Sequence, residues 1–252
     1  MSAQALRGDA FRALHEGAPF VIPNPWDAGS AKLLEELGFQ ALATTSSGFA
    51  FTLGRPDGGA TLDELVRHVA VLAEATSLPV SVDLENGHGP RPEDAAMAIV
   101  RAAEAGAVGG SIEDYDPASG IYERAAAVER IAAAVEAARS LPFDFVLTAR
   151  AENLIRGHDD LDDTIARLAA YEAAGADVVY APGLRSAEQI RAVREATTKP
   201  INVLARRDLS LAQIAQAGGQ RVSVGGALTW VARDAAAAAA RRMLADGDFG
   251  GL

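Results

Sequence analysis

The chain of 252 residues contains no cysteine. This absence excludes disulfides, thiolate metal ligands, iron–sulfur clusters and cysteine nucleophiles. Basic residues are also scarce, because 23 Lys and Arg stand against 34 Asp and Glu and leave a formal charge of −11. Binding to DNA, RNA or an anionic membrane needs clustered basic residues. We therefore expect no nucleic-acid partner and no membrane partner.

Long hydrophobic runs are absent as well. The first residues mix charged and apolar side chains and lack the continuous apolar stretch of a signal peptide. The alanine-rich run 231–240 is short and lies among arginines, so it predicts a packed helix rather than a membrane span. We expect a cytoplasmic protein.

Short β-rich runs alternate with longer helical patterns along the whole chain. The expected strands are 20–25, 41–46, 79–85, 110–115, 143–150, 177–181, 200–204 and 221–224. The expected helices between them are 28–37, 62–75, 92–105, 125–138, 161–174, 187–196 and 211–216, and an eighth starts near residue 229. Eight strands that are each followed by a helix predict an α/β fold, the (β/α)₈ barrel, also called a TIM barrel. No linker divides the chain, so we predict one domain over residues 1–252.

Polar residues collect where three neighbouring strands are expected to end, which is where barrel enzymes place their active sites. Asp83 and Glu85 are two residues apart in one strand, so their side chains are expected to point the same way. Glu113 and Arg150 end the next two strands. Oxygen ligands without His or Cys suit Mg²⁺ or Mn²⁺, and a buried arginine can bind a carboxylate or phosphonate. The structural alternative is that the three carboxylates only pair with Arg150 and cap loops.

With these residues on three strands, the sequence resembles the isocitrate lyase / phosphoenolpyruvate mutase superfamily over nearly its whole length. One such motif alone is weak support, whereas six in the same order on the expected strands are strong. The matching segments are PNPWDA at 23–28, TTSSGF at 44–49, RPDG at 55–58, DLENGHG at 83–89, IED at 112–114 and TAR at 148–150.

The resemblance implies roles for several residues. Asp83 matches the direct Mg²⁺ ligand of the family, while Glu85 and Glu113 match carboxylates that hold the metal through water. Arg150 matches an arginine that contacts the substrate, and Asp57 matches an acidic residue near metal and substrate. The segment with Ser47, Gly48 and Phe49 matches the part that binds the substrate carboxylate.

Several other residues are candidates for which a structural role competes. Trp26 is expected to pack in the core with one edge in the pocket, and Asn202 either reaches the pocket floor or is a satisfied interior amide. His88 is a candidate proton donor, whereas His15, His68 and His158 are expected at the surface. Gly225 and Gly226 resemble a barrel phosphate site, although a tight turn is the favoured interpretation.

The resemblance also implies a reaction. In the superfamily, Mg²⁺ binds the carboxylate and keto oxygen of a pyruvyl unit, so cleavage at its C3 leaves a metal-stabilised enolate. Cleavage of a C–C bond makes a lyase or decarboxylase, and cleavage or transfer of a C–P bond makes a phosphonate enzyme. The family also forms tetramers that exchange the last helix, so a homotetramer of helix-swapped dimers is implied, with the helix around 232–244 exchanged.

The chain departs from the family in the loop after the fourth strand. Lyases that cleave isocitrate or methylisocitrate carry a Lys-(Lys/Arg)-Cys-Gly-His loop, whereas this chain reads DYDPASGIY at 114–122. The lysine and asparagine of the mutase loop are missing too. Asp116, Ser119 and Tyr122 remain, and the last two are catalytic candidates of a decarboxylase or hydrolase.

Two function classes follow from these observations. The favoured one is a Mg²⁺-dependent enzyme that cleaves a small α-keto acid resembling oxaloacetate or phosphonopyruvate, and cleavage of isocitrate or 2-methylisocitrate is less expected. The alternative is a catalytically silent relative that binds an α-keto acid or oxalate. An unrelated barrel for phosphorylated sugars ranks last.

Overall fold

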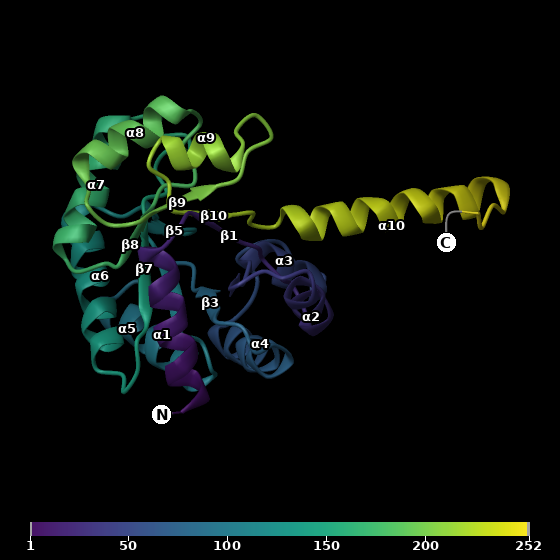
Figure 1. Cartoon of the computed structure of the whole chain (residues 1–252), viewed down its shortest axis with the longest axis horizontal. Coiled ribbons are helices and arrows are strands. Elements are labelled where there is room, and N and C mark those ends of the chain that lie inside the picture. The colour runs from purple at the N-terminus through teal and green to yellow at the C-terminus, as the bar shows by residue number, and fades with distance from the viewer. Residues whose placement is uncertain (1, 251–252) are drawn as a thin grey trace.

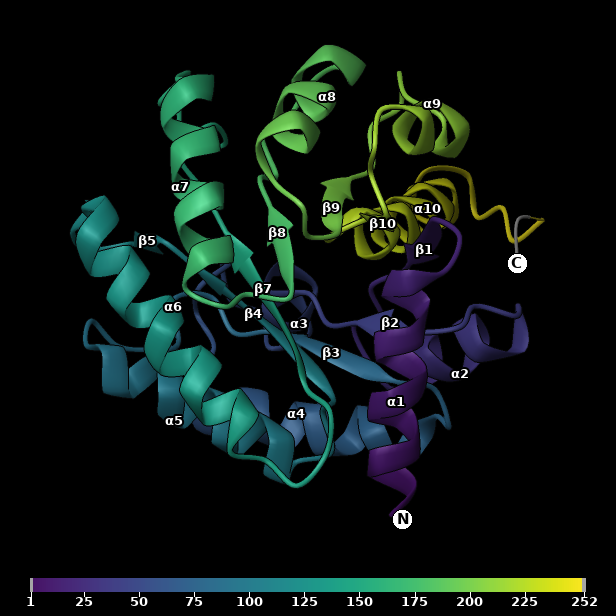
Figure 2. The ribbon, with the colours of Figure 1, turned by 60° about the vertical axis from the view of Figure 1, so that its left-hand side comes forward.

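In the computed structural model, which describes residues 2–250, eight parallel strands form a ring (Figure 2). Their order around the sheet is β1-β10-β9-β8-β7-β4-β3-β2. The amide of Ala43 donates to the carbonyl of Pro23 at 3.0 Å and links the two ends of this sheet. The strands are β1 Phe20–Ile22, β2 Leu42–Ala43, β3 Val80–Asp83, β4 Gly109–Glu113, β7 Val146–Arg150, β8 Val178–Tyr180, β9 Ile201–Leu204 and β10 Arg221–Ser223. The predicted (β/α)₈ barrel is confirmed.

A layer of helices surrounds the strands (Figure 2). The expected members are α2 Ala28–Glu36, α4 Leu62–Ala75, α5 Pro92–Glu104, α6 Arg124–Arg139, α7 Leu161–Ala173, α8 Ala187–Ala196 and α9 Leu211–Gln216. The eighth expected helix, α10 Ala227–Asp246, is present but does not join this layer. Three elements were not expected from the sequence: α1 Ala3–Glu16, α3 Ser46–Thr52 and a hairpin of β5 Tyr115–Asp116 with β6 Gly120–Ile121.

Helix α4 shows how local sequence and burial agree in this outer layer. The hydroxyl of Thr61 accepts from the amide of Glu64, and the Glu64 carboxylate accepts from the amide of Thr61. This capping box gives both amides at the start of the helix a hydrogen-bond partner. Leu65, Val69 and Leu72 follow at helical spacing and are buried against the barrel.

Helix α1 covers the N-terminal ends of the strands, and the mouth of the barrel is therefore the opposite end. Phe11 of α1 is fully buried, and a Cβ at Gly109, the first residue of β4, would lie 2.6 Å from the Phe11 ring. Gly109 is needed there because any side chain would displace α1 from the sheet.

The expectation that His15 and His68 lie at the surface is wrong, whereas His158 is exposed. His15 packs between Phe11 and Phe20 at the base of the barrel. Its Nδ1 bonds the carbonyl of Phe11 at 2.8 Å and its Nε2 faces Arg221 at 3.2 Å. Both histidines lie on the buried stripe of a helix, so their position on that stripe, rather than their polarity, decides their burial.

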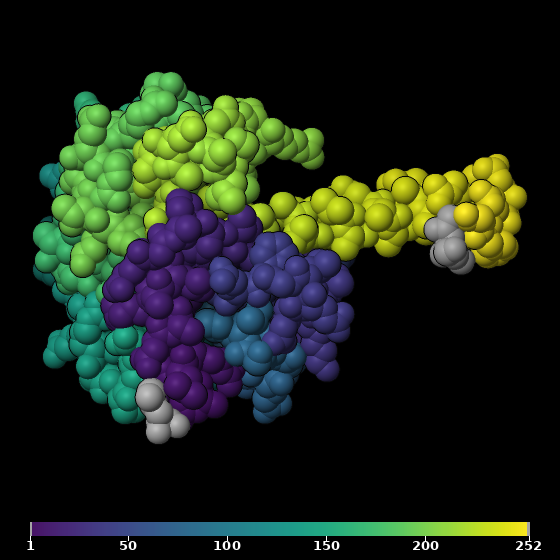
Figure 3. All heavy atoms as spheres, viewed as in Figure 1, coloured from purple at the N-terminus to yellow at the C-terminus, as the bar shows by residue number. Residues whose placement is uncertain are grey.

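Helix α10 projects from the barrel as an extended arm (Figures 1 and 3). Thr229, near its start, is the buried residue of this helix. Val231 and Leu244 are exposed, the latter to 91%. The expectation of a packed helix is therefore wrong within one chain. No helix among residues 2–250 is long and apolar enough to cross a membrane.

Candidate active site

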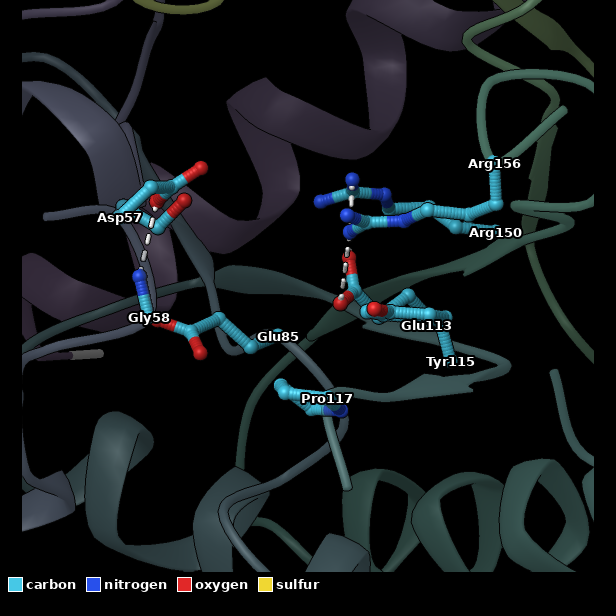
Figure 4. A pocket seen from close by; sticks show the side chains of 9 residues that line it. Asp57, Gly58, Glu85, Glu113, Tyr115, Pro117, Arg150 and Arg156 are labelled. Carbon is cyan, nitrogen blue, oxygen red and sulfur yellow. Dashed lines mark hydrogen bonds and ion pairs between the residues drawn. The ribbon is translucent and has the colours of Figure 1, made fainter. Parts of the chain in front are cut away.

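A polar pocket of about 220 Å³ opens at the C-terminal ends of β3, β4 and β7 (Figure 4). The register of the sheet places Glu113 of β4 directly beside Arg150 of β7. Asp83 ends β3, the strand on the other side of β4. These three predicted residues are thereby brought together. The pocket is lined by Ser46, Asp57, Gly58, Glu85, Glu113, Tyr115, Pro117, Arg150 and Arg156.

Arg150 is the centre of the charge cluster. Its guanidinium contacts Asp83 Oδ1 at 2.7 Å, Glu113 Oε2 at 2.9 Å and Glu152 Oε1 at 2.8 Å. Burial alone would lower the pKa of Arg150, but the charges of these carboxylates raise it well above its usual value. Arg150 is therefore a permanent cation at the pocket wall.

Glu85 reaches the pocket by a different route from the one expected. Strand β3 ends at Asp83, and Glu85 lies in the following loop with φ of 50°, so strand alternation does not align the two side chains. This left-handed conformation is unusual for a residue with a side chain and marks a strained position. Burial, together with the charges of Asp83 and Asp57, raises the pKa of Glu85 to about 7.

Asp57 lies across the pocket from the arginines, with Gly58 and Glu85 (Figure 4). Its exposed carboxylate accepts a hydrogen bond from the amide of Gly58 at 3.1 Å. The pocket therefore has an acidic wall, formed by Asp57 and Glu85, and a wall that carries Arg150 and Arg156 with Glu113.

The segment 44–49 contributes to the pocket mainly through its backbone rather than through its side chains. The amide of Ser46 donates to Asp83 Oδ2 at 3.3 Å, and Ser46 itself lines the pocket. Ser47 is half-buried, with its hydroxyl 3.2 Å from that of Thr45. A Cβ at Gly48 would lie 2.6 Å from the hydroxyl of Thr229, so glycine is required there.

Of the predicted substrate-binding residues, Arg150 lines this pocket, whereas Trp26, Ser47, Gly48, Phe49 and Asn202 do not. Phe49 stacks on His68 with ring centroids 4.0 Å apart. Together with Trp26, these rings line a separate, more apolar groove between α2, α3 and α4.

Asn202 lines a smaller cavity that adjoins the pocket and that Asp83 and Arg150 also line. Its amide donates to Ser223 at 3.0 Å and its carbonyl accepts from Arg221 at 2.8 Å, so it is satisfied inside the barrel.

The hairpin β5–β6 holds the remaining predicted catalytic residues. Ser119 is exposed at its tip. The Tyr122 hydroxyl lies 3.2 Å from both Asp116 and Asn86, and the Arg130 guanidinium covers its ring. Neither Ser119 nor Tyr122 lines the pocket, whereas Tyr115 and Pro117 of the same hairpin do.

Sequence reasoning did not single out Tyr115, Glu152 or Arg156. Glu152 is almost completely buried, and it bonds Arg150 through Oε1 and Arg156 through Oε2. Their spacing in the sequence is the one feature that could have indicated these contacts: Glu152 follows Arg150 by two residues and precedes Arg156 by four. Such spacing becomes informative only once the chain after β7 is known to turn back over the mouth.

The donor set of the pocket fits a hard divalent cation. Three carboxylates, Asp57, Glu85 and Glu113, line the pocket, and Asp83 and Glu152 contact its arginines, so five carboxyl groups stand against the two guanidinium groups of Arg150 and Arg156. Among residues 2–250, no three His, Asp or Glu side chains are grouped so that they hold one ion directly. Mg²⁺ commonly keeps several waters and takes one or two carboxylates, which matches this arrangement.

Comparison with known proteins agrees with this geometry. The family model described as phosphoenolpyruvate phosphomutase matches residues 11–244. The chain belongs to this family. It is therefore a member of the phosphoenolpyruvate mutase / isocitrate lyase superfamily, as the sequence motifs predict.

Relatives of the chain include enzymes with different reactions. It is 33% identical to 2-methylisocitrate lyase of Escherichia coli K12, over 77% of this chain and 68% of that protein. It is 33% identical to oxaloacetate decarboxylase of Rhodopseudomonas palustris TIE-1, over 77% of this chain and 69% of that protein. The chain is 55% identical to a candidate lyase/mutase from Burkholderia cenocepacia J2315 whose crystal structure is known. The two structures match with a TM-score of 0.96 over 99% of this chain and 91% of that chain.

Proposed function

We propose that the protein is a Mg²⁺-dependent enzyme, with Mn²⁺ as an alternative ion, that cleaves a C–C or C–P bond of a small α-keto acid. The observation that carries this proposal is the grouping of three carboxylates at the barrel mouth: Asp83 and Glu113 contact Arg150, and Glu85 lines the facing wall of the same pocket. We also propose that it acts in the cytoplasm.

The residues of the pocket have separable tasks in this proposal. Asp83, Glu85 and Glu113 would hold the cation, which would supply Lewis-acid stabilisation of negative charge on the substrate oxygens. Arg150 donates to an anionic oxygen of the substrate from a fixed position, because three carboxylates hold its guanidinium. We assign Ser47 and Gly48 to the substrate carboxylate on the family resemblance alone, because neither residue lines the pocket, whereas Asp57 lines the wall opposite the arginines.

The hairpin favours loss of CO₂ over cleavage of 2-methylisocitrate. That cleavage breaks a bond beside a hydroxyl, so a base must take the hydroxyl proton and an acid must protonate the departing carbon. The lyase loop supplies a cysteine for this work, and the present hairpin offers Tyr115 and Pro117 to the pocket instead. Release of CO₂ from a β-keto acid needs neither proton transfer in the bond-breaking step.

A substrate screen tests the proposal. Oxaloacetate, phosphonopyruvate and 2-methylisocitrate are supplied with and without Mg²⁺, and release of pyruvate, phosphate or succinate is measured. We expect metal-dependent turnover of one of the first two. Asp83→Asn is expected to lower kcat/KM at least a hundredfold, whereas Asp9→Asn, the same change on α1 at the closed end of the barrel, leaves it unchanged.

The silent-relative alternative predicts a different pattern in the same screen. Oxalate with Mg²⁺ would raise the melting temperature while no compound is turned over. Turnover that is equal with and without metal, or equal in Asp83→Asn and the unaltered protein, would contradict the proposed enzyme.

We further propose a homotetramer in which α10 of each chain packs on another chain, as a dimer of helix-swapped dimers. The observation behind this proposal is that α10 extends away from its own barrel with exposed Val231 and Leu244.

A further inference from the structure

Two guanidinium groups lie side by side on one wall of the pocket (Figure 4). Arg150 belongs to β7, and Arg156 follows six residues later in the loop that returns over the mouth. Arg150 is largely buried, whereas Arg156 keeps 37% of its side chain exposed. Like charges at such a short separation repel each other, so this arrangement needs an explanation.

One buried carboxylate holds both arginines in place. Glu152 Oε1 accepts from Arg150 at 2.8 and 3.1 Å. Its Oε2 accepts from Arg156 Nε at 3.2 Å and forms an ion pair with Arg156 Nη2 at 3.1 Å. Glu152 is itself fixed, because its amide donates to Asp114 Oδ1 at 2.8 Å. The positions of the two guanidinium groups are therefore fixed by a buried, hydrogen-bonded carboxylate and do not result from a chance surface contact.

The hairpin supports Arg156 from a second side. Its guanidinium stacks on the ring of Tyr115, 3.7 Å from the ring centroid, and Glu113 Oε1 lies 3.7 Å from its Nη2. The Nε and Nη2 groups face Glu152, while Nη1 has no protein acceptor among the contacts of residues 2–250. A stacked, clamped guanidinium with a free donor edge in a pocket is pre-organised to accept an anion.

We propose that Arg156 is a specificity residue that binds the second anionic group of the substrate, the carboxylate or phosphonate on C3, while Arg150 serves the keto-acid end. This inference rests on the proposed function. The contacts of the two arginines support this assignment. Arg150 is paired with three carboxylates, whereas Arg156 is half exposed and its Nη1 faces no protein acceptor among residues 2–250.

The inference predicts a selective loss of affinity. Two Mg²⁺-dependent ligands are compared by calorimetry: oxalate, which mimics only the keto-acid end, and 3,3-difluorooxaloacetate, which also carries the second carboxylate. One charge-assisted hydrogen-bonded contact corresponds to about a tenfold to hundredfold change in affinity. We expect Arg156→Gln to weaken difluorooxaloacetate by that factor and oxalate by less than about twofold.

Two further variants separate specificity from structure. Arg156→Lys keeps the charge and is expected to recover part of the lost affinity, since lysine cannot reproduce the fork. Arg191→Gln removes an exposed arginine on α8 and is expected to change neither affinity. Parallel phosphonopyruvate measurements distinguish a carboxylate from a phosphonate as the preferred second group.

The outcomes separate this inference from the proposed function. If the unaltered protein binds both ligands and Arg156→Gln weakens both equally, Arg156 only supports the fold of the mouth and the inference is wrong. Unchanged binding of both ligands in Arg156→Gln would also overturn it, with the proposed function intact. If the unaltered protein binds neither ligand with Mg²⁺, the proposed function and the inference fall together.

Discussion

The charged residues at the barrel mouth are held in place by one another. Arg150 contacts three carboxylates, and one of these, Glu152, also holds Arg156. Removal of one partner from such a buried network leaves an uncompensated charge, which is costly. Residue-scale changes here therefore affect the position of several groups at once. Sites outside the network allow cleaner tests.

Gly48 provides one such test. A Cβ there would lie 2.6 Å from both the Thr229 hydroxyl and the Thr45 methyl, so Gly48→Ala is expected to destabilise the fold by about 1–3 kcal/mol. Gly29→Ala is the matched control, because its Cβ would meet only Asp27 Oδ1 at an ordinary 3.5 Å. Urea unfolding of both variants measures the difference. Equal stability of the two variants would mean that the close approach of α10 to α3 is absent.

The buried histidine at the base of the barrel predicts a pH-dependent loss of stability. Burial and the nearby charges of Arg221 and Arg12 lower the pKa of His15 to about 3, while the Phe11 carbonyl opposes this shift. An unfolded histidine has a pKa of about 6.5, so the unfolded state binds the proton first. The contribution of His15 to stability is therefore present above pH 6.5 and decreases by about 2 kcal/mol between pH 7 and pH 5.

The measurement is the difference in unfolding free energy between pH 7 and pH 5. His15→Gln is expected to reduce that difference by about 2 kcal/mol, because glutamine does not titrate. His158→Gln, at an exposed position, is expected to leave it unchanged. A His15→Gln protein with the original pH dependence would show that His15 is not held neutral.

At the scale of elements, the hairpin β5–β6 is the least regular part of the mouth. It carries Tyr115 and Pro117 into the pocket, and Tyr122 ties it to the loop after β3 through Asn86. Tyr122 also bonds Asp116 within the hairpin. The Tyr122 hydroxyl therefore links the hairpin directly to the loop after β3, beside a second connection through Arg130, which covers the Tyr122 ring and donates to the Asn86 carbonyl.

Replacement of that hydroxyl tests the link. Tyr122→Phe removes contacts to Asn86 and Asp116 and is expected to lower kcat/KM about fivefold to fiftyfold, with faster proteolytic cleavage of the hairpin. Ser119→Ala at the exposed tip is the comparison and is expected to change activity less than twofold. A tenfold or larger loss in Ser119→Ala would instead show that Ser119 enters the reaction directly.

Helices and strands are predicted well from the sequence where buried apolar residues recur at a regular spacing. All eight barrel strands are present, because each is a short apolar run between helices. Asp83, Glu113 and Arg150 meet because all three end neighbouring strands. Helix α3 was missed because its seven residues are too few to display a helical period.

The remaining site residues depend on loop geometry that no period encodes. Arg156 reaches the pocket because the chain turns back after β7, and Glu85 does so through a left-handed backbone conformation. Phe49 and Trp26 lie in the correct motifs, but the start of α3 directs them to the outer groove. Motif position thus identifies the segment, while the backbone determines which of its side chains enter the pocket.

For the whole molecule, the most prominent feature is the exposure of α10. The helix has twenty residues, extends from the barrel and has its apolar side chains Val231 and Leu244 in the open (Figure 3). An isolated helix of this length gains little stability in water, because most helical stability comes from packing of one face. Its alanine-rich sequence presents a smooth surface on which another chain can pack closely. A lone chain leaves that surface without a partner among residues 2–250.

The proposed homotetramer predicts a molar mass four times that of one chain in light scattering at micromolar concentration. Leu244→Asp is expected to shift the mass towards smaller species, because it places a charge in the proposed contact. Leu6→Asp on α1 is the matched control, since Leu6 is an exposed leucine at the closed end of the barrel. A monomer in the unaltered protein, or the same mass in both variants, would contradict the exchange of α10. Activity measured alongside the mass shows whether the mouth works in a single barrel or needs the assembled protein.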